Sequence, residues 1–538
     1  MSLFDSASLC VTPNAYKEDK LYSIKPTDGS GDLVVTRATT ATRVNSAGLV
    51  EEVPYNLLTY SEQFDNAAWS KISVGSASVP VVTANSTTAP NGTLTADKIV
   101  FNAPASGDIS IIKQNISLTG TANGSIYIKA FSNSDIGKII GFRFNADTYA
   151  LITLTDSWQR FSVSQVALES FDIQLRPSVG TSSGSVSVYV WGDQLVTGSS
   201  AKEYFPTTDR LNVPRIDYTN GSCPSILVEP QRTNLLTYSE QFNDASWDKL
   251  SSTITANTTI SPDGTTNADT LVITSGGYLL KTILSFSAVT GQSITASIFV
   301  KNQTTNFLAF GGATIAGTDV YSIENYGNGW YRHKVTRTFT VTVVGLIQYI
   351  IFDKVGTHII WGGQLEVGSY ATSYIPTVAS SVTRNADVIS KTGISSLIGQ
   401  TEGTIFIDAY RTNKSTNYQA ILGLGNGTST TEMIEMFFRD TNELTIGVYN
   451  SGQQFVNTSA ISSGRHKIAL AYKLNDYALY IDGALIATDN SGTVPTMNKL
   501  NIGGFNYTSG DEYSDGINSV QLYKTRLTNA ELATLTTI

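Results

Sequence analysis

One nonapeptide occurs twice in this chain of 538 residues. The sequence Asn-Leu-Leu-Thr-Tyr-Ser-Glu-Gln-Phe is found at residues 56–64 and again at 234–242. Identity over nine consecutive positions indicates a duplicated module, and a repeat of this size constrains the whole fold. All six tryptophans of the chain fall into matched pairs across the two copies: Trp69 with Trp247, Trp158 with Trp330, and Trp191 with Trp361.

Each copy, at residues 56–209 and 234–378, is predicted to be a β-sandwich. Apolar side chains alternate along short segments, so that Ile126 and Ile128 share one face of a predicted strand. Short alternating strands separated by Gly, Ser, Thr and Asn are typical of two packed antiparallel sheets. The six tryptophans are expected in the cores of the modules, and a platform for sugar stacking is the alternative role.

The composition excludes several classes of protein. Charged residues make up 15% of the chain and the net charge is −9. Nucleic acid is not an expected partner, because phosphate binding requires a basic patch. No apolar run approaches the ~20 residues that cross a bilayer, so membrane insertion is not expected. The N-terminus lacks the basic and apolar segments of a secretory signal, which predicts synthesis in the cytoplasm without export by that route.

The segments that flank the modules are expected to be an arm and two linkers. Residues 1–55 are too short for a core of their own and form either a disordered tail or an arm that docks onto a partner. The regular placement of apolar residues favours the docking arm, and the linkers are predicted at 210–233 and 379–399. The candidate anchoring residues of the arm are Leu3, Phe4, Leu9, Leu21, Tyr22 and Ile24.

The C-terminal region, residues 400–538, contains no tryptophan and a new set of predicted strands. The segments 404–410, 466–472 and 477–483 alternate, and Thr528 with Glu531 has the spacing of a capping box for a short terminal helix. The two cysteines, Cys10 and Cys223, lie in unlike contexts, and a disulfide between them is not expected.

The motifs of the modules resemble those of a known group. The nonapeptide, then Pro-Asn/Asp-Gly-Thr, then Trp-Gly-x-Gln-Leu follow one another in both copies. This order resembles the jelly-roll, carbohydrate-binding-module-like repeats of bacteriophage tail and fibre proteins. Residues 2–8 and 43–50 are similar to the N-termini of structural proteins of phages that infect Bacteroidetes, including the crAss-like group.

The C-terminal region resembles a second family. Lys-x-x-Leu-x-Tyr, Leu-Tyr-Ile-Asp-Gly, Ile-Gly-Gly, Val-x-Leu-Tyr and Leu-Thr-x-x-Glu follow in this order between residues 467 and 531. The order is similar to that of the concanavalin A-like, laminin-G-type lectin and glucanase sandwich. This fold hosts both lectins and glycosidases, so the resemblance implies a fold and no particular activity.

A catalytic set is not found in the sequence. Glu432 and Glu435 have i,i+3 spacing, so on one strand the two carboxylates would point to opposite faces. The segment 180–184 matches a nucleophile elbow by letter but lacks its strand-to-helix context. The three histidines are scattered and no set of metal-ligand spacing is present, so neither a metal nor a cofactor is expected.

One acidic and aromatic loop near the C-terminus is the candidate ligand site. Clustered carboxylates suit hard cations such as calcium and aromatic faces suit sugars, whereas a solvated loop between strands is the alternative. The candidate glycan-binding residues are Asn506, Tyr507, Asp511, Tyr513 and Asp515.

These observations predict an all-β protein with an extended N-terminal arm, two tandem jelly-roll sandwiches and a concanavalin A-like sandwich. The expected function is that of a non-enzymatic virion structural protein, a fibre or appendage of a phage head or tail on the particle surface. Capsid, portal or tail proteins are the expected partners, host cell-surface glycan is a candidate ligand, and the expected oligomer is a homotrimer. A tail-associated glycan depolymerase that acts through the C-terminal domain is the alternative, and a bacterial surface adhesin is disfavoured by the missing signal.

Overall fold

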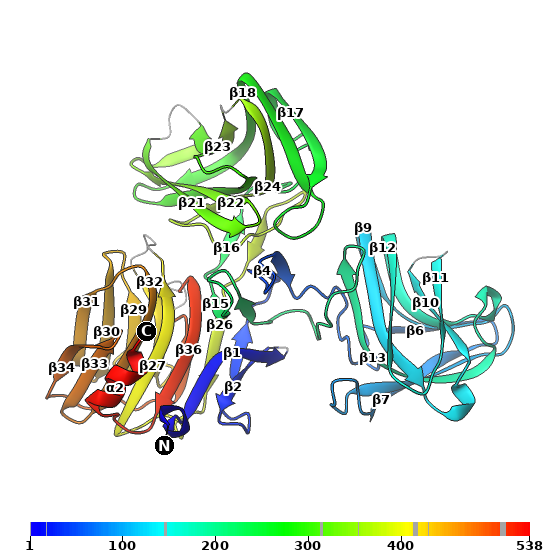
Figure 1. Cartoon of the computed structure of the whole chain (residues 1–538), viewed down its shortest axis with the longest axis horizontal. Coiled ribbons are helices and arrows are strands. Elements are labelled where there is room, and N and C mark those ends of the chain that lie inside the picture. Colours follow the sequence, from blue (N-terminus) through cyan, green and yellow to red (C-terminus); the bar gives the residue numbers. More distant parts are fainter. Residues whose placement is uncertain are drawn as a thin grey trace. The chain divides into compact units, whose positions relative to one another are not determined.

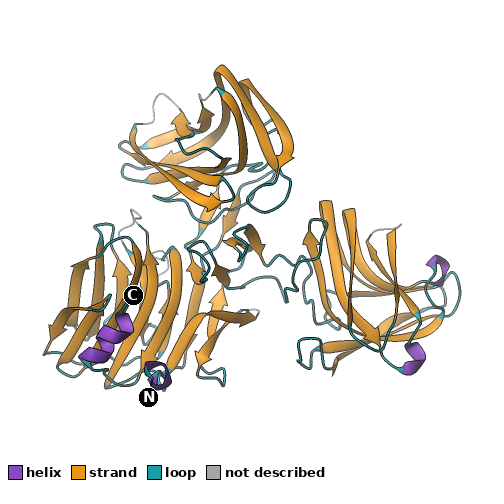
Figure 2. Cartoon of the chain, viewed as in Figure 1, coloured by secondary structure: helices purple, strands orange, loops and turns teal. Residues whose placement is uncertain are grey.

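The structure is a computed structural model that describes residues 2–17, 19–144, 148–311, 316–352, 355–412, 418–428, 430–505 and 513–538. Strands dominate it, and the helices of the described residues are short (Figure 2). The all-β sandwich architecture predicted from the sequence is confirmed. The chain divides into two compact units, one of residues 54–211 and one of residues 1–53 with 212–538.

The first module forms the smaller unit (cyan in Figure 1). Its strands follow the order β11-β10-β12-β9-β13-β8-β7, and β6 pairs with β9. The long strands β9 and β12 take part in both layers, and apolar side chains from the two layers meet in one core. The elements are β6 Ser70–Val74, β7 Ser78–Thr87, β8 Ala96–Ala103, β9 Ile109–Ala130, η1 Asn133–Asp135, β10 Ile139–Phe144, β11 Thr148–Thr153, β12 Gln159–Leu175, η2 Pro177–Val179 and β13 Gly184–Thr197.

The second module repeats this plan within the larger unit. Its order is β20-β23-β18-β24-β19-β22-β21, and β17 pairs with β18. Equivalent residues keep the same register, since Val190 lies opposite Asp97 in the first copy and Ile360 lies opposite Asp269 in the second. The strands are β17 Asp248–Thr259, β18 Ala268–Ala288, β19 Ser293–Lys301, β20 Leu308–Gly311, β21 Gly317–Gly327, β22 Trp330–Phe339, β23 Val343–Phe352 and β24 Gly356–Val367.

One strand has different partners in the two copies. In the first module β11 pairs with β10, from Ile139 opposite Thr153 to Phe144 opposite Thr148. In the second module the corresponding strand, β21, pairs instead with β22, from Gly317 opposite Phe339 onward. The duplicated sequence therefore gives one topology with a single exchanged strand.

The nonapeptide joins the entry of each module to its exit. Asn56 donates through Nδ2 to the carbonyls of Asp193 and Phe205, and its Oδ1 accepts from the amides of Leu58 and Leu195. In the second copy Asn234 makes the four equivalent bonds, to Gly363, Ile375, Leu236 and Leu365. Both asparagines are fully buried. The repeated motif is therefore a structural clip that holds the two ends of a module together.

The C-terminal sandwich forms one continuous path of strands with the N-terminal segment. The order is β31-β30-β29-β28-β35-β26-β3-β2-β1-β36-β27-β32-β33-β34. Helix α2, Asn529–Thr536, begins after Thr528, and the capping box predicted for Thr528 and Glu531 is present. The strands from this region are β26 Val388–Thr392, β27 Glu402–Arg411, β28 Gln419–Gly425, β29 Glu432–Phe438, β30 Glu443–Asn450, β31 Gln453–Ala460, β32 Gly464–Lys473, β33 Asp476–Ile481, β34 Ala484–Asp489, β35 Lys499–Ile502 and β36 Asp515–Tyr523.

The N-terminal segment closes one side of this sandwich and is not an extended arm. After helix α1, Leu3–Ser6, come β1 Leu9–Lys17, β2 Lys20–Lys25 and β3 Leu33–Thr36. Strand β1 pairs with β36 and β3 pairs with β26, so this segment bridges the two layers. Figure 1 shows β1 and β2 in blue beside the C-terminal strand β36.

The six apolar residues expected to anchor the arm differ in how far they are buried. Leu9 and Leu21 are fully buried in the core of the sandwich, which removes them from any surface that could contact another protein. Leu3 packs on a smaller cluster beside α2, and Tyr22 and Ile24 are half-buried. Phe4 alone of the six is largely exposed, at 45%. This correction follows from strand pairing over more than 500 residues of sequence, which no local pattern reveals.

The segments expected to be linkers are also paired. Hairpin β4 Ala41–Val44 with β5 Val50–Val53 precedes the first module, and β14 Arg215–Asp217 with β15 Ser225–Val228 precedes the second. Strand β15 pairs with β36, and β16 Arg232–Asn234 pairs with β25 Val382–Arg384. Both modules are thus insertions in the sequence of a sandwich built from residues near 9–36, 225–228 and 388–538, which explains why each module needs a clip at its base.

Two further features of the described residues bear on function. Cys10 is buried and Cys223 exposed, and both are free thiols. None of the helices that the structure describes is long and apolar enough to cross a membrane.

Candidate functional site

A cleft of about 490 Å³ lies in the larger unit beside the hairpin of β21 and β22. Period-two alternation places every second side chain of each strand on the cleft side. Residues of hairpins β4–β5 and β14–β15, the 369–374 segment and residues 514–516 complete the wall. The floor residues are Val320, Ser322, Glu324 and Tyr326 of β21 and Arg332, Lys334, Thr336 and Thr338 of β22.

The cleft is lined mainly by hydroxyl groups and aromatic rings. Ser and Thr hydroxyls come from several lining segments, and Asn220 adds an amide. Tyr326 and Tyr370 contribute aromatic rings, and burial raises the pKa of Tyr326 to about 12, so that its hydroxyl stays neutral. Hydroxyls, an amide and tyrosines form hydrogen bonds and stacking surfaces of the kind that neutral polar ligands require.

The four carboxylates that line the cleft are engaged in the protein itself. Asp217 accepts hydrogen bonds from the amides of Val44 and Thr219, at 2.7 and 2.8 Å. Glu324 forms an ion pair with Lys334. Asp515 accepts from the amides of Thr412 and Gly516. The fourth, Glu229, belongs to the buried ion network described next.

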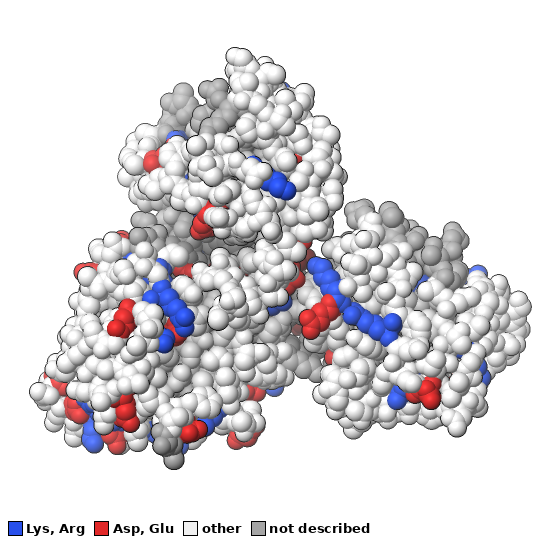
Figure 3. Space-filling view, in the orientation of Figure 1, with Lys and Arg blue, Asp and Glu red and all other residues white. Residues whose placement is uncertain are grey.

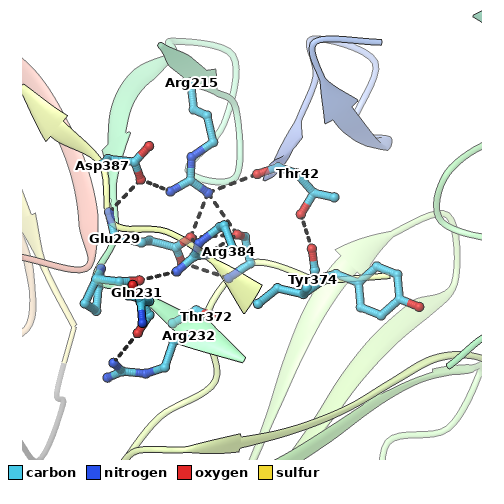
Figure 4. Close-up of polar contacts among 12 residues, drawn as sticks. Thr42, Arg215, Glu229, Gln231, Arg232, Thr372, Tyr374, Arg384 and Asp387 are labelled. Atoms are coloured by element: carbon cyan, nitrogen blue, oxygen red, sulfur yellow. Dashed lines mark hydrogen bonds and ion pairs between the residues drawn. The ribbon is translucent and has the colours of Figure 1, made fainter. Parts of the chain in front are cut away.

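Five charged side chains form a buried network where the N-terminal segment and both ends of the second module meet, and Figure 4 labels four of them, Arg215, Glu229, Arg384 and Asp387. Arg215 donates to Glu229 at 2.7 Å and also contacts Asp387. Arg384 forms a second ion pair with Glu229, and Arg37 lies 2.6 Å from Asp387. None of the five is more than 4% exposed.

Electrostatics within the network keep its acids ionised. Burial alone would raise the pKa of Glu229, but the guanidinium groups of Arg384 and Arg215 outweigh it and hold that pKa far below its ordinary value. The pKa of Asp387 is lowered in the same way, by Arg215 and Arg37 against the effect of burial. A carboxylate held by two guanidinium groups cannot serve as a general acid, so the network is structural.

The predicted loop site is only partly within the described residues. Asn506, Tyr507 and Asp511 lie outside them. Tyr513 is fully buried and its hydroxyl donates to the carbonyls of Tyr410 and Gly516, so its ring faces the core and cannot stack on a sugar. Asp515 is 9% exposed and lines the cleft.

Most of the matched tryptophans are buried. Trp69 and Trp247 each donate from the indole to a carbonyl of their own motif, Tyr60 or Tyr238. Trp191, Trp330 and Trp361 are between 2% and 4% exposed. Trp158 is half-buried, which sets it apart from its partner Trp330.

The other residues considered for chemistry occupy ordinary structural positions. Glu432 accepts from Asn426 at the start of β29, and the buried Glu435 lies three residues further along that strand. Gly180 ends the short helix η2 with φ +100°, and the serines that follow lie in the loop between η2 and β13. His466 contacts Asp482 at 2.6 Å. Within the described ranges, no group of three or more His, Cys, Asp or Glu side chains is arranged to hold a metal ion.

The cleft itself was not predicted, although the sequence carries a signal for its floor. Polar residues occupy every second position from 332 to 338, and in 318–324 the same alternation is interrupted by Val320, which is close to the pattern of two strands with one polar face. Nothing in that pattern shows what lies opposite. Figure 3 shows that most of the visible surface is uncharged, in keeping with the low charged content of the chain.

Comparisons with known proteins bear on the C-terminal domain. Residues 394–533 match the model of the concanavalin A-like lectin/glucanases superfamily, Laminin_G_3. No curated protein matches the chain. The C-terminal domain is therefore a concanavalin A-like sandwich, a fold shared by lectins and glucanases.

Several solved structures are similar to part of the chain. The CBM40 of Ruminococcus gnavus IT-sialidase bound to alpha2,3 sialyllactose is 19% identical, with a TM-score of 0.24 over 27% of this chain and 91% of that one. The NanB sialidase of Streptococcus pneumoniae is 16% identical, with a TM-score of 0.24 over 27% and 26% of the two chains. The heptameric SAP-like pentraxin of Limulus polyphemus is 14% identical, with a TM-score of 0.20 over 25% and 68%.

Proposed function

We propose that this chain binds a glycan without cleaving it, and that the cleft beside β21 and β22 is a binding site. The observation that carries the proposal is the lining of the cleft, where hydroxyls and tyrosines are combined with carboxylates that the protein already uses. Sugars present many hydroxyl groups and apolar ring faces, so this lining suits them. The concanavalin A-like fold of the C-terminal domain is compatible with this function.

The depolymerase alternative requires two carboxylic groups that are free to exchange protons with a substrate. Retaining glycosidases hold such a pair about 5–5.5 Å apart and inverting ones about 6.5–9.5 Å apart. In the cleft, Asp217, Glu229, Glu324 and Asp515 are each held by amides or cations. Binding is therefore the function that the geometry favours.

The test combines binding with a search for cleavage. The purified full chain is applied to an array of bacterial surface polysaccharides, and bound polymers are then incubated with it and assayed for new reducing ends. Binding without new reducing ends supports the proposal. Release of reducing ends would establish the depolymerase instead, and an array without any bound glycan would contradict both.

Two matched variants locate the site. Ser322→Trp places an indole in the cleft, whereas Tyr321→Trp places one on the opposite face of the same strand, where Tyr321 is 46% exposed. We expect Ser322→Trp to lower glycan affinity about tenfold or more, which corresponds to roughly 1.4 kcal/mol, and Tyr321→Trp to leave it unchanged. Equal affinities of the two variants would exclude the cleft.

We further propose that the protein is displayed on a phage particle and associates there with capsid, portal or tail proteins as a homotrimer. The resemblance of residues 2–8 and 43–50 to phage structural proteins supports this assignment. Labelled antibody on purified particles is the direct test, and sedimentation of the purified chain tests the trimer. An unlabelled particle, or a chain that sediments as a monomer, would contradict the corresponding part.

The attachment experiment must respect the fold. Deleting residues 1–50 would remove β1 to β3 from the sandwich, so loss of the protein from particles would have no clear meaning. Deleting residues 2–7 removes α1 and leaves β1 in place, and Phe4→Ser removes the one largely exposed candidate. Wild-type incorporation of both variants would exclude this segment as the anchor.

A further inference from the structure

The first module carries a row of cationic and aromatic side chains on the outer face of its sheet. Tyr189 of β13 lies directly between Lys98 of β8 and Lys129 of β9 in the strand register. Directly opposed residues of neighbouring strands point to the same side of a sheet. Phe131 and Trp158 extend the row at its two ends, since Phe131 contacts Tyr189 and Lys129 reaches Trp158.

The contacts along the row alternate between ammonium groups and rings. Lys98 Nζ lies 3.5 Å from the centre of the Phe131 ring. Lys129 Nζ lies 4.9 Å from the ring of Trp158 and 5.4 Å from that of Tyr189. All five side chains reach solvent, with Phe131 38% exposed.

The two ammonium groups have no anionic partner in the described part of the chain. Neither Lys98 nor Lys129 forms an ion pair with any carboxylate there. A ring face favours a cation but leaves its charge and its hydrogen-bond donors available on the solvent side. The row is thus locally positive on a chain whose net charge is −9.

Only part of the row is specific to the first copy, because Lys129 and Trp158 recur as Lys301 and Trp330 in the second. Where the first module has Lys98 and Tyr189, the second has the paired residues Thr270 and Ile359. The neighbouring row is shared instead, because Tyr127, Trp191 and Arg160 correspond to Phe299, Trp361 and Arg332. A shared row that is largely buried serves the fold, so the row that differs is the candidate for a separate role.

The exchanged strand explains why the row is accessible. In the second module Trp330 is 3% exposed, because β21 pairs beside it and Tyr326 and Val50 pack in the same cluster. In the first module β11 pairs with β10, and Trp158 stays half-buried, covered on one side by the segment that accepts its indole hydrogen bond at Thr88. The face that the second copy buries is therefore open in the first among the described residues.

From this geometry we infer that the outer face of the first module binds an anionic sugar, a pyranose that bears a carboxylate. The two ammonium groups match the carboxylate in charge, and the aromatic rings between and beside them match the apolar face of the sugar ring. The inference is independent of the cleft in the other unit, because it uses none of the same residues. A contact with a second copy of this chain is disfavoured, because it would bury two lysines that have no ion-pair partner among the described residues, and burying them would cost free energy.

The test compares charged with neutral oligosaccharides on the full chain. Tetragalacturonate and tetraglucuronate are titrated calorimetrically, with maltotetraose as the neutral match. We expect the acidic sugars to bind at least tenfold more tightly than maltotetraose, and their affinity to fall as ionic strength rises. Equal affinity for charged and neutral sugars, or no binding of either acidic sugar, would overturn the inference.

The variants copy residues that the same fold already accommodates. Lys98→Thr combined with Tyr189→Ile introduces the residues of the second module at equivalent positions, so the first module is expected to fold. Lys301→Thr is the control, because Lys301 lies 5.5 Å from the buried Trp330 in the second module. The double variant should lose about tenfold in affinity for tetragalacturonate, while Lys301→Thr and the cleft variant Ser322→Trp should not change it.

Two outcomes would refute the assignment. If the double variant binds tetragalacturonate as the wild type does, the row is not the site. If it changes the sedimentation of the chain and leaves sugar binding intact, the face is a contact between copies. Thermal unfolding of the double variant shows whether the first module is still folded. If it is not, Lys98→Thr alone is titrated with tetragalacturonate.

Discussion

Arg37 and Asp387 are 350 residues apart in the sequence, yet Nη1 of the arginine lies 2.6 Å from Oδ1 of the aspartate in the interior of the protein. Their side chains are 0% and 1% exposed. Arg215 contacts the other oxygen of Asp387, so one carboxylate joins the N-terminal segment, the start of the second module and the segment that follows it. The network therefore determines how the larger unit is assembled from distant stretches of chain.

Removing the carboxylate at position 387 should destabilise the larger unit strongly. Asp387→Asn leaves the guanidinium groups of Arg37 and Arg215 buried without their charge partner, and breaking a buried pair in this way costs about 3–5 kcal/mol. Urea unfolding, with the two units followed separately by hydrogen exchange, measures the change. Glu402→Gln is the control, because its pair with Lys473 is 33% and 52% exposed and should contribute less than about 1 kcal/mol.

The clip asparagines should act on their own units. Asn56→Ala removes four hydrogen bonds and leaves buried carbonyls and amides unpaired, which we expect to cost about 3–5 kcal/mol in the unit of residues 54–211. Asn234→Ala should have the same effect on the other unit. Each variant is the control of the other in the hydrogen-exchange experiment, and equal effects of one variant on both units would contradict the clip.

The fully buried Asp193 should make the first module less stable as the pH rises. Neither carboxylate oxygen of Asp193 forms a hydrogen bond with a described residue. Burial raises the pKa of Asp193 well above its usual value, and the nearby backbone amide of Gln194 lowers that pKa only in part. Because the folded pKa is raised, stability is full below the unfolded value near 4 and is lost as the pH increases above it.

Asp193→Asn is expected to remove that loss. The gain in stability over wild type should be small at pH 4 and about 1–3 kcal/mol at pH 8, the cost of an unsatisfied buried group. Thermal unfolding across this pH range checks it. Gly363→Asp, at the equivalent position of the second module, should introduce a loss of stability as the pH rises. The added carboxyl group would be buried there, because a side chain at this position meets Leu236 and Phe242 at about van der Waals distance. A pH-independent difference between wild type and Asp193→Asn would refute the interpretation.

A second pH effect is expected in the second module. Burial, with Asp263 nearby, raises the pKa of Glu240 to about 7, although the Tyr374 hydroxyl donates to it at 3.2 Å. Because the pKa of Glu240 is raised in the folded state, the second module is most stable at low pH, and its free energy of unfolding decreases as the pH rises from about 4.5 to 7. Glu240→Gln should flatten this dependence by roughly 1–2 kcal/mol, after allowance for partial exposure. Asp263→Asn should reduce it in part, and unchanged pH profiles in both variants would contradict the assignment.

Several elements could be predicted from residues close together in the sequence. The duplication followed from the nonapeptide, and the sandwich followed from alternation such as that of Ile126 and Ile128, because side chains in a strand alternate between faces. The capping box of Thr528 and Glu531 involves residues three positions apart, so it too could be recognised. The role of Asn56 could not, because three of its four partners are more than 130 residues away.

The errors concern pairing between distant segments. The N-terminal segment was expected to be an arm, because residues 1–55 are too short for a core of their own. Leu21 pairs with the nearby Tyr16 and Leu33, but Leu9 pairs with Leu522 of β36. Both leucines lie in the core that the N-terminal segment shares with the C-terminal strands. The acidic loop was weighed by composition alone, which did not reveal that Tyr513 points inward.

Local periodicity and repetition are enough to identify this protein as a set of β-sandwiches with one module used twice, because they decide which segments form strands. Which edges those strands pair with depends on the packing of the whole chain. In the second copy, β21 pairs with β22 and lines the cleft. In the first copy, the corresponding strand β11 pairs with β10 and leaves Trp158 accessible, although the two sequences have the same origin. The physical reason is that a strand edge can pair with any free edge, and which edge is free depends on everything else that has already packed.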